Sequence, residues 1–235
     1  MLEIAEEPFL SLQGEGILSG TPMMFVRLAR CNLRCTECDT AYAQDKGTMT
    51  PLESIMEHLW TSSVRWVCIT GGEPLLHNID DLVEAIVGSD RRVTVETNGL
   101  LAASTTVFIH TSLWTVSPKM TNSGRSEKQI EESMANVARF VKGRRVQLKF
   151  ICRKPTDVAE ALEYVQYVEK HYNASMQDIP VIIQPQAFAT DKVEDNLAVL
   201  RQLWKLMPSM LNLYPYDIRV MPQLHRLLYG MRRRV

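Results

Sequence analysis

The sequence predicts one α/β domain in which parallel strands alternate with helices. Short apolar runs recur along the 235 residues, and most are followed by a segment whose apolar residues repeat with helical spacing. There is neither an internal repeat nor a linker, so residues 1–235 are expected to form a single domain. Short strands that alternate with longer helices are typical of right-handed parallel βαβ units.

The elements can be assigned in order along the chain. Strands are expected at residues 22–29, 65–70, 92–96, 113–117, 146–151 and 181–184, which are short apolar runs. Helices are expected at residues 50–59, 80–87, 127–142, 156–172 and 193–207. The first helix has a clear start, because Thr50, Pro51 and Glu53 match a capping box with proline in the first turn. Gly88 ends the second helix.

The composition favours a cytoplasmic protein. The five cysteines are odd in number and three are clustered, which argues against a secreted disulfide framework. No apolar run approaches the length of a membrane span, and the first residues do not resemble a secretory signal. The formal net charge of -1 argues against a broad surface for nucleic acid or membranes. The arginines at residues 232–234, taken alone, indicate a solvated basic tail.

Five of the expected strands are followed directly by polar or thiol-containing loops. These loops lie at residues 31–38, 71–74, 96–99, 117–119 and 184–186. Any one of them alone would be an ordinary turn. Because the carboxyl ends of parallel strands meet at one edge of a sheet, where ligands bind in such folds, the loops are expected to form one site.

Cys31, Cys35 and Cys38 form a C-x3-C-x2-C cluster in the first of these loops. Three thiolates can hold a soft metal centre but are one ligand short of a closed zinc or iron–sulfur site. Cys68 and Cys152 lie in apolar runs, where a free cysteine usually behaves as a small buried hydrophobe. The cluster favours a [4Fe-4S] centre with one open iron, which can bind S-adenosylmethionine (SAM). The alternatives are a zinc loop completed by His or Asp, or a chance grouping of cysteines.

The motifs resemble those of radical SAM enzymes and, within them, those of the 7-carboxy-7-deazaguanine synthase family. C-x3-C-x2-C, a GGEP turn and a chain of βα units are shared with the whole superfamily. The motifs that resemble the narrower family are SLQGEG at 11–16, FVRLARCNLRCTECDT at 25–40, TGGEP at 70–74, ETNG at 96–99, SPK at 117–119, LKF at 148–150 and PQLHRLLYG at 222–230. C-x3-C-x2-C alone marks the superfamily, whereas QGEG and PQLH, which lie at opposite ends of the chain, together distinguish the narrower family.

This resemblance implies a fold and an activity. The fold would be a partial (βα)6 barrel formed by residues 1–235 as a single radical SAM domain, with the C-terminal tail folded back onto the active site. The reaction would convert 6-carboxy-5,6,7,8-tetrahydropterin to 7-carboxy-7-deazaguanine with loss of ammonia, a step of queuosine-type deazapurine biosynthesis. The implied cofactors are a [4Fe-4S] cluster, SAM and Mg²⁺. The implied partners are an electron donor such as flavodoxin or ferredoxin, and a second copy of the chain in a homodimer.

The resemblance also assigns residues to the substrate. The substrate-binding group would comprise Leu12, Gln13, Gly14, Arg27, Thr70 and the terminal carboxylate of Val235. Arg27 suits the substrate carboxylate because a guanidinium can bind it through two parallel hydrogen bonds. Arg27, Glu15 and His225 would be catalytic, with Glu15 at the guanidine-like edge of the pterin. The competing interpretations are a solvated acid for Glu15 and a structural histidine for His225.

A second group is assigned to the cofactors. Cys31, Cys35 and Cys38 would hold the cluster, and Thr40 would bind Mg²⁺ with substrate oxygens and waters completing the shell. By spacing alone, Thr40 would be a turn residue. The residues expected at SAM are Glu37, Cys38, Asp39, Gly72, Glu73, Ser117, Pro118, Lys119, Gln184, Pro185, Gln186 and Ala187.

Two features depart from the family pattern. Glu37 stands immediately before the third cysteine, where the family often has an aromatic residue beside the adenine, so side-chain stacking is not expected there. The stretch from residue 99 to residue 113 is too short for a full helix and a strand. The barrel is therefore expected to be trimmed in that stretch.

Two other classes of function stay open at this point. A glycyl-radical enzyme activase has the same cysteine spacing but acts on a protein partner, and it would need neither QGEG nor PQLH. A non-enzymatic zinc-binding module would use the cysteines only to brace a loop. Metal analysis separates them, because the module would hold one zinc and no acid-labile sulfide.

Overall fold

The fold is built on one mostly parallel sheet. The computed structural model describes the chain except for residues 37, 187–192, 212–214, 231, 233 and 235. In this described part, ten strands form an open sheet in the order β10-β9-β8-β7-β6-β5-β3-β1-β4, and β2 pairs with β3 off this path. The strands are β1 (Leu2–Ile4), β2 (Phe9–Leu12), β3 (Pro22–Leu28), β4 (Thr48–Thr50), β5 (Trp66–Gly71), β6 (Arg92–Thr97), β7 (Thr111–Val116), β8 (Val146–Cys152), β9 (Val181–Pro185) and β10 (Ile218–Val220). An open sheet of this kind is consistent with the partial barrel that the sequence predicts.

The six predicted strands are confirmed. They are β3, β5, β6, β7, β8 and β9, and they pair in parallel in this order. β10 extends the parallel part beside β9, whereas β1, β2 and β4 pair antiparallel at the other end. The sequence analysis missed these four strands because each is only three or four residues long. Such short segments carry no readable hydrophobic period.

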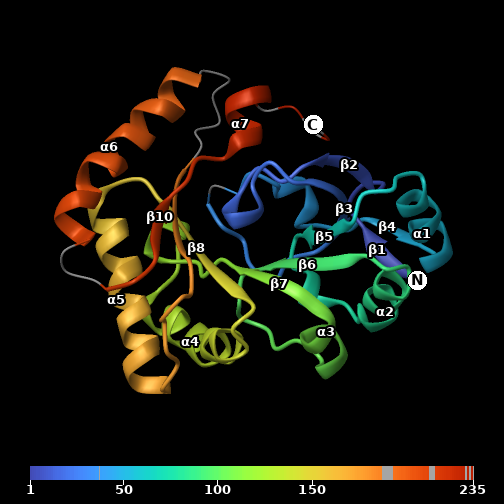
Figure 1. The fold of residues 1–235 in the computed structure, drawn as a ribbon, viewed down its shortest axis with the longest axis horizontal. Helices are drawn as coiled ribbons and strands as arrows, with labels where there is room; N and C mark the ends of the chain where they lie inside the picture. The colour runs from blue at the N-terminus through green and yellow to red at the C-terminus, as the bar shows by residue number, and fades with distance from the viewer. Residues whose placement is uncertain (37, 187–192, 212–214, 231, 233, 235) are drawn as a thin grey trace.

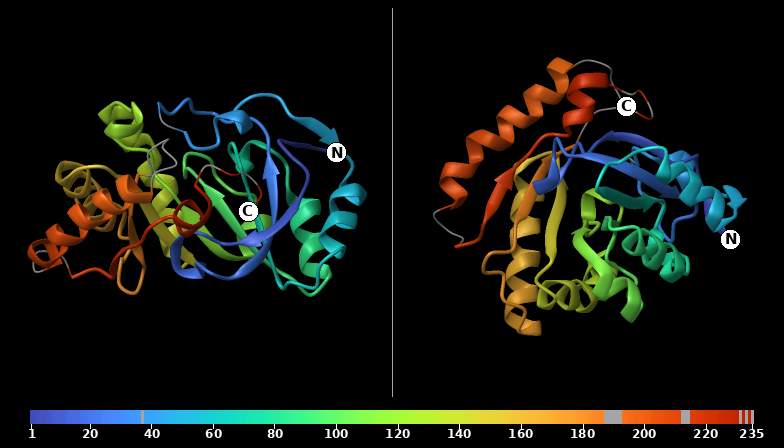
Figure 2. Two further views of the ribbon diagram at one scale, coloured as in Figure 1. Left: turned by 90° about the horizontal axis from the view of Figure 1, so that it is seen from above. Right: turned by 45° about the vertical axis from the view of Figure 1, so that its right-hand side comes forward.

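Helices cover the outer side of the sheet. They are α1 (Leu52–Trp60), α2 (Asp80–Gly88), α3 (Thr105–His110), α4 (Glu127–Lys142), α5 (Pro155–Tyr172), α6 (Val193–Leu211) and α7 (Leu224–Tyr229). In Figure 1, α1 to α6 follow the sheet around its right, lower and left sides, while α7 and the C-terminus lie near β2 at the top. The two views of Figure 2 show the same neighbourhood of α7, the C-terminus and the N-terminal part of the chain. None of the described helices combines the length and apolar character of a membrane span.

Two local expectations can be checked. The predicted capping box at Thr50 is wrong: Thr50 ends β4, where it pairs with Leu2, and Pro51 is the N-cap without a side-chain hydrogen bond. The shortened segment before β7 is confirmed, because α3 has only six residues and leads directly into Thr111. The α3 N-terminus is capped by Ser104, whose hydroxyl accepts a hydrogen bond from the Val107 amide at 3.1 Å.

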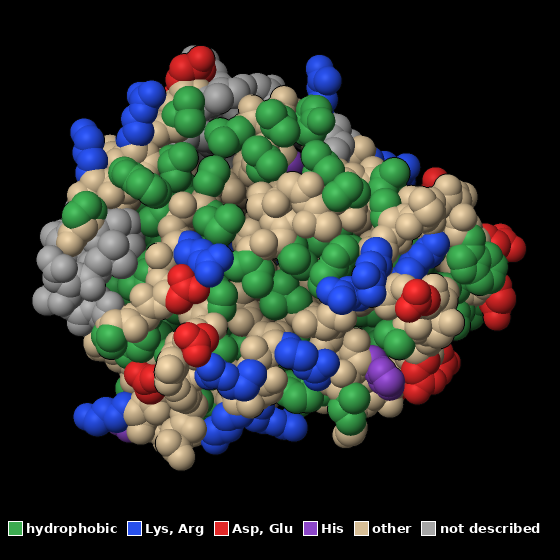
Figure 3. All heavy atoms as spheres, viewed as in Figure 1, with side chains coloured by type: hydrophobic (Ala, Val, Ile, Leu, Met, Phe, Trp, Pro, Cys, Tyr) green, Lys and Arg blue, Asp and Glu red, His purple; other side chains and the backbone are tan. Residues whose placement is uncertain are grey.

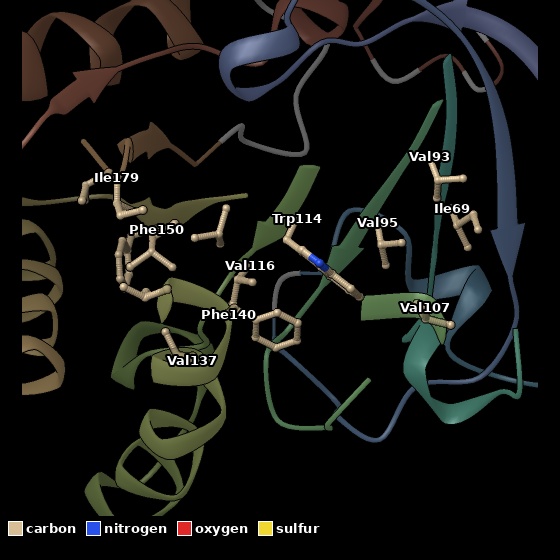
Figure 4. Close-up of a cluster of buried hydrophobic side chains, with 14 of the residues drawn as sticks. Ile69, Val93, Val95, Val107, Trp114, Val116, Val137, Phe140, Phe150 and Ile179 are labelled. Atoms are coloured by element: carbon tan, nitrogen blue, oxygen red, sulfur yellow. The ribbon is translucent and has the colours of Figure 1, made fainter. Parts of the chain in front are cut away.

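The core lies between the sheet and the outer helices. Figure 4 shows strand residues such as Val95 and Trp114 gathered with Phe140 from α4. The Trp114 and Phe140 rings are 4.7 Å apart between centroids, and Phe150 of β8 meets Tyr164 of α5 edge-on at 5.7 Å. Aromatic pairs at these spacings add to the stabilisation from burial. This packed layer fixes the positions from which the loops at the carboxyl ends of the strands begin.

The face drawn in Figure 3 carries charges of both signs. Some Lys and Arg side chains on that face lie beside Asp or Glu side chains, and several others gather along its lower edge.

The packing predicts a large effect of shortening Trp114, which is 1% exposed. Trp114→Ala should lower the free energy of unfolding by about 3–5 kcal/mol, because it leaves a cavity at the centre of the core. Trp60→Ala is the matched control, since Trp60 is 61% exposed. Urea denaturation of both variants checks the difference, and equal losses in the two would contradict the assigned core.

Candidate active site

One cavity lies at the carboxyl ends of the parallel strands. Its volume is about 380 Å³, and all five predicted loops contribute to its wall. Of the predicted site residues, those that line it are Leu12, Gln13, Gly14, Glu15, Arg27, Cys31, Cys35, Cys38, Asp39, Thr40, Thr70, Gly72, Ser117, Lys119, Gln184, Gln186 and His225. The sequence therefore identified residues that the fold brings to one place.

The remaining predicted residues divide into two groups. Glu73, Pro118 and Pro185 are buried and do not form the cavity wall. Glu37, Ala187 and Val235 lie outside the residues that the structure describes. Their assignments, like the roles of the lining residues, stay predictions.

Glu73 joins two of the loops. Its carboxylate is fully buried and accepts hydrogen bonds from the Thr97 hydroxyl at 2.7 Å and the Asn98 amide at 2.8 Å. It also accepts from the Leu75 amide at 3.1 Å. Burial raises the pKa of Glu73, although these hydrogen bonds oppose the rise. The side chain thus braces the GGEP and ETNG turns against each other from behind the cavity wall.

Glu15 forms a buried ion pair with Lys149 of β8. The Glu15 carboxylate also accepts hydrogen bonds from Gln184 Nε2 at 3.2 Å and Gln223 Nε2 at 2.5 Å. Burial alone would raise the pKa of Glu15, but the positive charge of Lys149, that of His225 when it is protonated, and these hydrogen bonds hold it well below its usual range. Glu15 is therefore a fixed negative charge on the cavity wall, and the solvated-acid interpretation is wrong.

The two ends of the chain meet at this cavity. The Leu224 amide donates to the Gly14 carbonyl at 2.8 Å, which ties PQLH to QGEG. A side chain at Gly14 would clash with His225, since an added Cβ would lie 2.0 Å from Nδ1. Burial lowers the pKa of His225, with Glu15 and Asp39 acting in the opposite sense. His225 is therefore held at the cavity wall in a position that only glycine at residue 14 permits.

Lys149, Gln223 and Glu96 were not predicted as site residues. Lys149 could have been found, because a lysine between Leu148 and Phe150 in a buried strand requires a charged partner. Glu96 lines the cavity and accepts hydrogen bonds from the Thr70 hydroxyl at 2.9 Å and Gln13 Nε2 at 3.0 Å. Glu96 belongs to the recognised ETNG motif, but nothing in the sequence indicated that it would form hydrogen bonds with Thr70 and Gln13.

The cysteine loop is closed at its base by backbone hydrogen bonds. The Arg30 amide donates to the Asp45 carbonyl at 3.0 Å, and the Cys31 amide donates to the Gln44 carbonyl at 3.2 Å. Cys31, Cys35 and Cys38 are free, half-buried thiols on the cavity wall. Within the described residues, no three His, Cys, Asp or Glu side chains converge as a metal site, so the joint ligation of a metal by these thiols stays a prediction.

Cys68 and Cys152 are confirmed as buried hydrophobes. They are 0% and 1% exposed, and burial raises the pKa of both thiols. Neither residue lines the cavity.

Comparison with known proteins decides the family. The family model of the Radical SAM superfamily matches residues 26–168. A 7-carboxy-7-deazaguanine synthase from Thermoplasma acidophilum is 30% identical over 228 residues, which is 95% of this chain and 96% of that protein. The chain belongs to the 7-carboxy-7-deazaguanine synthase family of radical SAM enzymes.

Two further likenesses agree with this membership. A 7-carboxy-7-deazaguanine synthase from Hyperthermus butylicus is 40% identical over 167 residues, covering 68% of this chain and 69% of that protein. The crystal structure of QueE from Escherichia coli shares the fold with a TM-score of 0.60 at 20% identity, covering 94% and 93% of the two chains. These relatives favour the synthase over the activase and the zinc-binding module.

Membership in the radical SAM superfamily implies a [4Fe-4S] cluster and SAM, and the residues at the cavity fit these groups. Three soft thiol donors line the cavity. Oε1 of Gln184 is buried and accepts no hydrogen bond from the described protein, so it can accept one from a ligand. Lys119 and Ser117 also line the cavity, with Lys119 Nζ 2.9 Å from the Ser117 hydroxyl, and they add polar groups suited to the cofactor.

The lowered pKa of Glu15 predicts a pH-dependent contribution to stability. A carboxyl group whose pKa is lower in the folded than in the unfolded state stabilises the fold above its ordinary pKa, and this contribution is lost as the pH falls toward the lowered value. The free energy of unfolding should therefore fall more steeply in the wild type than in Glu15→Gln between about pH 5 and pH 3. Urea unfolding at several pH values measures both slopes, and parallel curves would argue against the ion pair.

Proposed function

We propose that this chain converts 6-carboxy-5,6,7,8-tetrahydropterin to 7-carboxy-7-deazaguanine, with loss of ammonia, as a step of queuosine-type deazapurine biosynthesis. The observation that carries the proposal is the meeting of QGEG, PQLH and the cysteine loop at one cavity. The cysteine loop alone fits any radical SAM enzyme. The two terminal segments fit the narrower family, whose members carry the name of this activity.

The cofactor end of the cavity would hold the reactive groups. Cys31, Cys35 and Cys38 would bind the cluster, while Lys119 and Gln184 would contact SAM. When bound, these cofactors supply a carbon-centred radical that removes a hydrogen atom from the substrate. The protein orients the reactants and limits the access of water, and the buried Glu73 contributes by holding two of the turns in place.

The substrate end offers complementary polar groups. The guanidinium of Arg27 suits the substrate carboxylate, since it can donate two parallel hydrogen bonds. Gln13, Thr70 and Glu96 form a connected set of donors and acceptors beside it. The amide-like and guanidine-like edges of a pterin require both kinds of group.

Glu15, Lys149 and His225 would control charge and protons during the loss of ammonia. Burial lowers the pKa of Lys149, but the negative charges of Glu15 and Glu96 outweigh this effect and raise it, so the ammonium remains charged. Burial favours the neutral imidazole of His225. A neutral imidazole can accept a proton. The Lys149–Glu15 pair stays charged and would keep the electrostatic environment of His225 constant.

Three finer features belong to the same proposal. Mg²⁺ would bind through the Thr40 hydroxyl, which lies 3.6 Å from Cys38 Sγ at the cavity wall; substrate oxygens and waters would supply its other ligands. A flavodoxin or ferredoxin would donate the electron. The active form would be a homodimer.

Anaerobic turnover of the reconstituted protein tests the proposal. The assay would contain the carboxytetrahydropterin, SAM, Mg²⁺ and a reductant, with products followed by mass spectrometry. We expect 7-carboxy-7-deazaguanine to form without stoichiometric consumption of SAM. The formation of 5′-deoxyadenosine without this product would leave the radical chemistry in place but refute the substrate.

Cys35→Ala should fold but fail to hold the [4Fe-4S] cluster, because two thiolates remain where three are needed. Cys152→Ala is the matched control: it removes a buried thiol that does not line the cavity, and the cluster should be retained. Iron and sulfide analysis with absorption spectroscopy compares the two. A full cluster spectrum in Cys35→Ala would rule out its assignment as a ligand.

A further inference from the structure

Glu6 lies where three separate segments of the chain meet. It stands in the turn between β1 and β2, and its side chain is only 8% exposed. Its Oε1 accepts hydrogen bonds from Arg27 Nε at 2.7 Å and the Tyr42 hydroxyl at 2.8 Å. Its Oε2 accepts one from Arg234 Nε at 3.3 Å. One carboxylate therefore contacts strand β3, the cysteine loop and the C-terminal tail.

The contact with Glu6 fixes the direction of the Arg27 guanidinium. Glu6 occupies only the Nε position, and the two terminal nitrogens of Arg27 have no protein partner among the described residues. Arg27 also lines the cavity. A guanidinium held at Nε has a defined orientation, and its two terminal nitrogens remain available to bind a carboxylate through parallel hydrogen bonds.

Two guanidinium groups flank Glu6. Burial tends to raise the pKa of Glu6, but the hydrogen bond from Tyr42 and the interactions with Arg27 and Arg234 outweigh it, so that pKa is lowered. Glu6 is therefore ionised at neutral pH. Its carboxylate forms ion pairs with Arg27 and Arg234, and both arginines line the cavity.

We propose that Glu6 is a positioning residue with two roles. It orients Arg27 toward the carboxylate of the substrate, and it anchors the C-terminal tail at the cavity through Arg234. The first role rests on the proposed function, because it requires a substrate with a carboxylate. The second role is independent of the substrate.

Three variants separate these roles. Glu6→Gln weakens both contacts. Arg234→Gln removes the anchor but keeps the pair between Arg27 and Glu6. Glu7→Gln is the matched control, because Glu7 is the neighbouring acid, its side chain is 69% exposed, and it lies 3.8 Å from the same Arg234 guanidinium. Circular dichroism would establish that each variant is folded before it is compared.

Trypsin cleavage after Arg232, followed by intact mass spectrometry without substrate, measures the anchor. Glu6→Gln and Arg234→Gln should be cleaved several-fold faster than the wild type, roughly three- to tenfold, since an ion pair at a partly buried carboxylate is lost. Glu7→Gln should stay within about twofold of the wild type, because its pair is long and exposed. Equal cleavage rates in all four proteins would overturn the anchoring role.

Turnover kinetics measure the orienting role. Glu6→Gln should raise the KM for the carboxytetrahydropterin about tenfold with a much smaller change in kcat, since Arg27 would lose its fixed direction. Arg234→Gln should raise KM less, and SAM binding measured by calorimetry should be unchanged in both. An unchanged KM in Glu6→Gln would overturn this role. If the wild type does not convert the pterin, the proposed function fails, whereas the cleavage experiment still decides the anchor.

Discussion

The buried ion pair between Glu15 and Lys149 is the interaction on which the site depends. Removing two charges from water is costly unless they are paired and their remaining hydrogen-bonding capacity is satisfied. Here Gln184 and Gln223 donate the additional hydrogen bonds to Glu15. Glu15 comes from the N-terminal loop, Lys149 and Gln184 come from the sheet, and Gln223 comes from the C-terminal segment. All three parts of the chain are therefore needed to satisfy the buried pair.

This requirement explains why motifs at opposite ends of the chain occur together. QGEG provides Glu15 and also Gly14, whose missing side chain leaves room for His225. PQLH provides Gln223 and His225, and its backbone is tied to Gly14 by the Leu224 amide. Neither segment alone could satisfy the buried carboxylate. The part of the cavity that we propose for the substrate is thus formed by both terminal segments, whereas the part proposed for the cofactors is formed by successive βα loops.

The sequence predicted the parallel strands and the polar loops that follow them because both depend on local signals, whereas the other predicted residues of the cavity wall came from the family resemblance. Apolar runs such as that of β8 are long enough to be recognised, and the polar loops follow them directly. The helix-capping pattern at Thr50 gave a wrong prediction, because Thr50 pairs with Leu2 of β1, which lies far away in the sequence, and this pairing determines its conformation. Glu6 and Glu96 were missed for the same reason: their partners, Arg234 and Gln13, lie far away along the chain.

The carboxylates on the cavity wall differ from the one behind it in how they are used. Glu73 is fully buried and satisfied by backbone and hydroxyl donors, so it acts on the geometry of the turns without placing its charge in the cavity. Glu6, Glu15 and Glu96 all line the cavity, and Glu6 and Glu15 are paired with cations. Under the proposed function, the cavity must also accept the carboxylate of the substrate, and it can hold these acids only if cations balance them. Arg27, Lys149 and Arg234 provide these cations. On this proposal, the placement of charge, more than the shape of the sheet, suits the cavity to an anionic substrate.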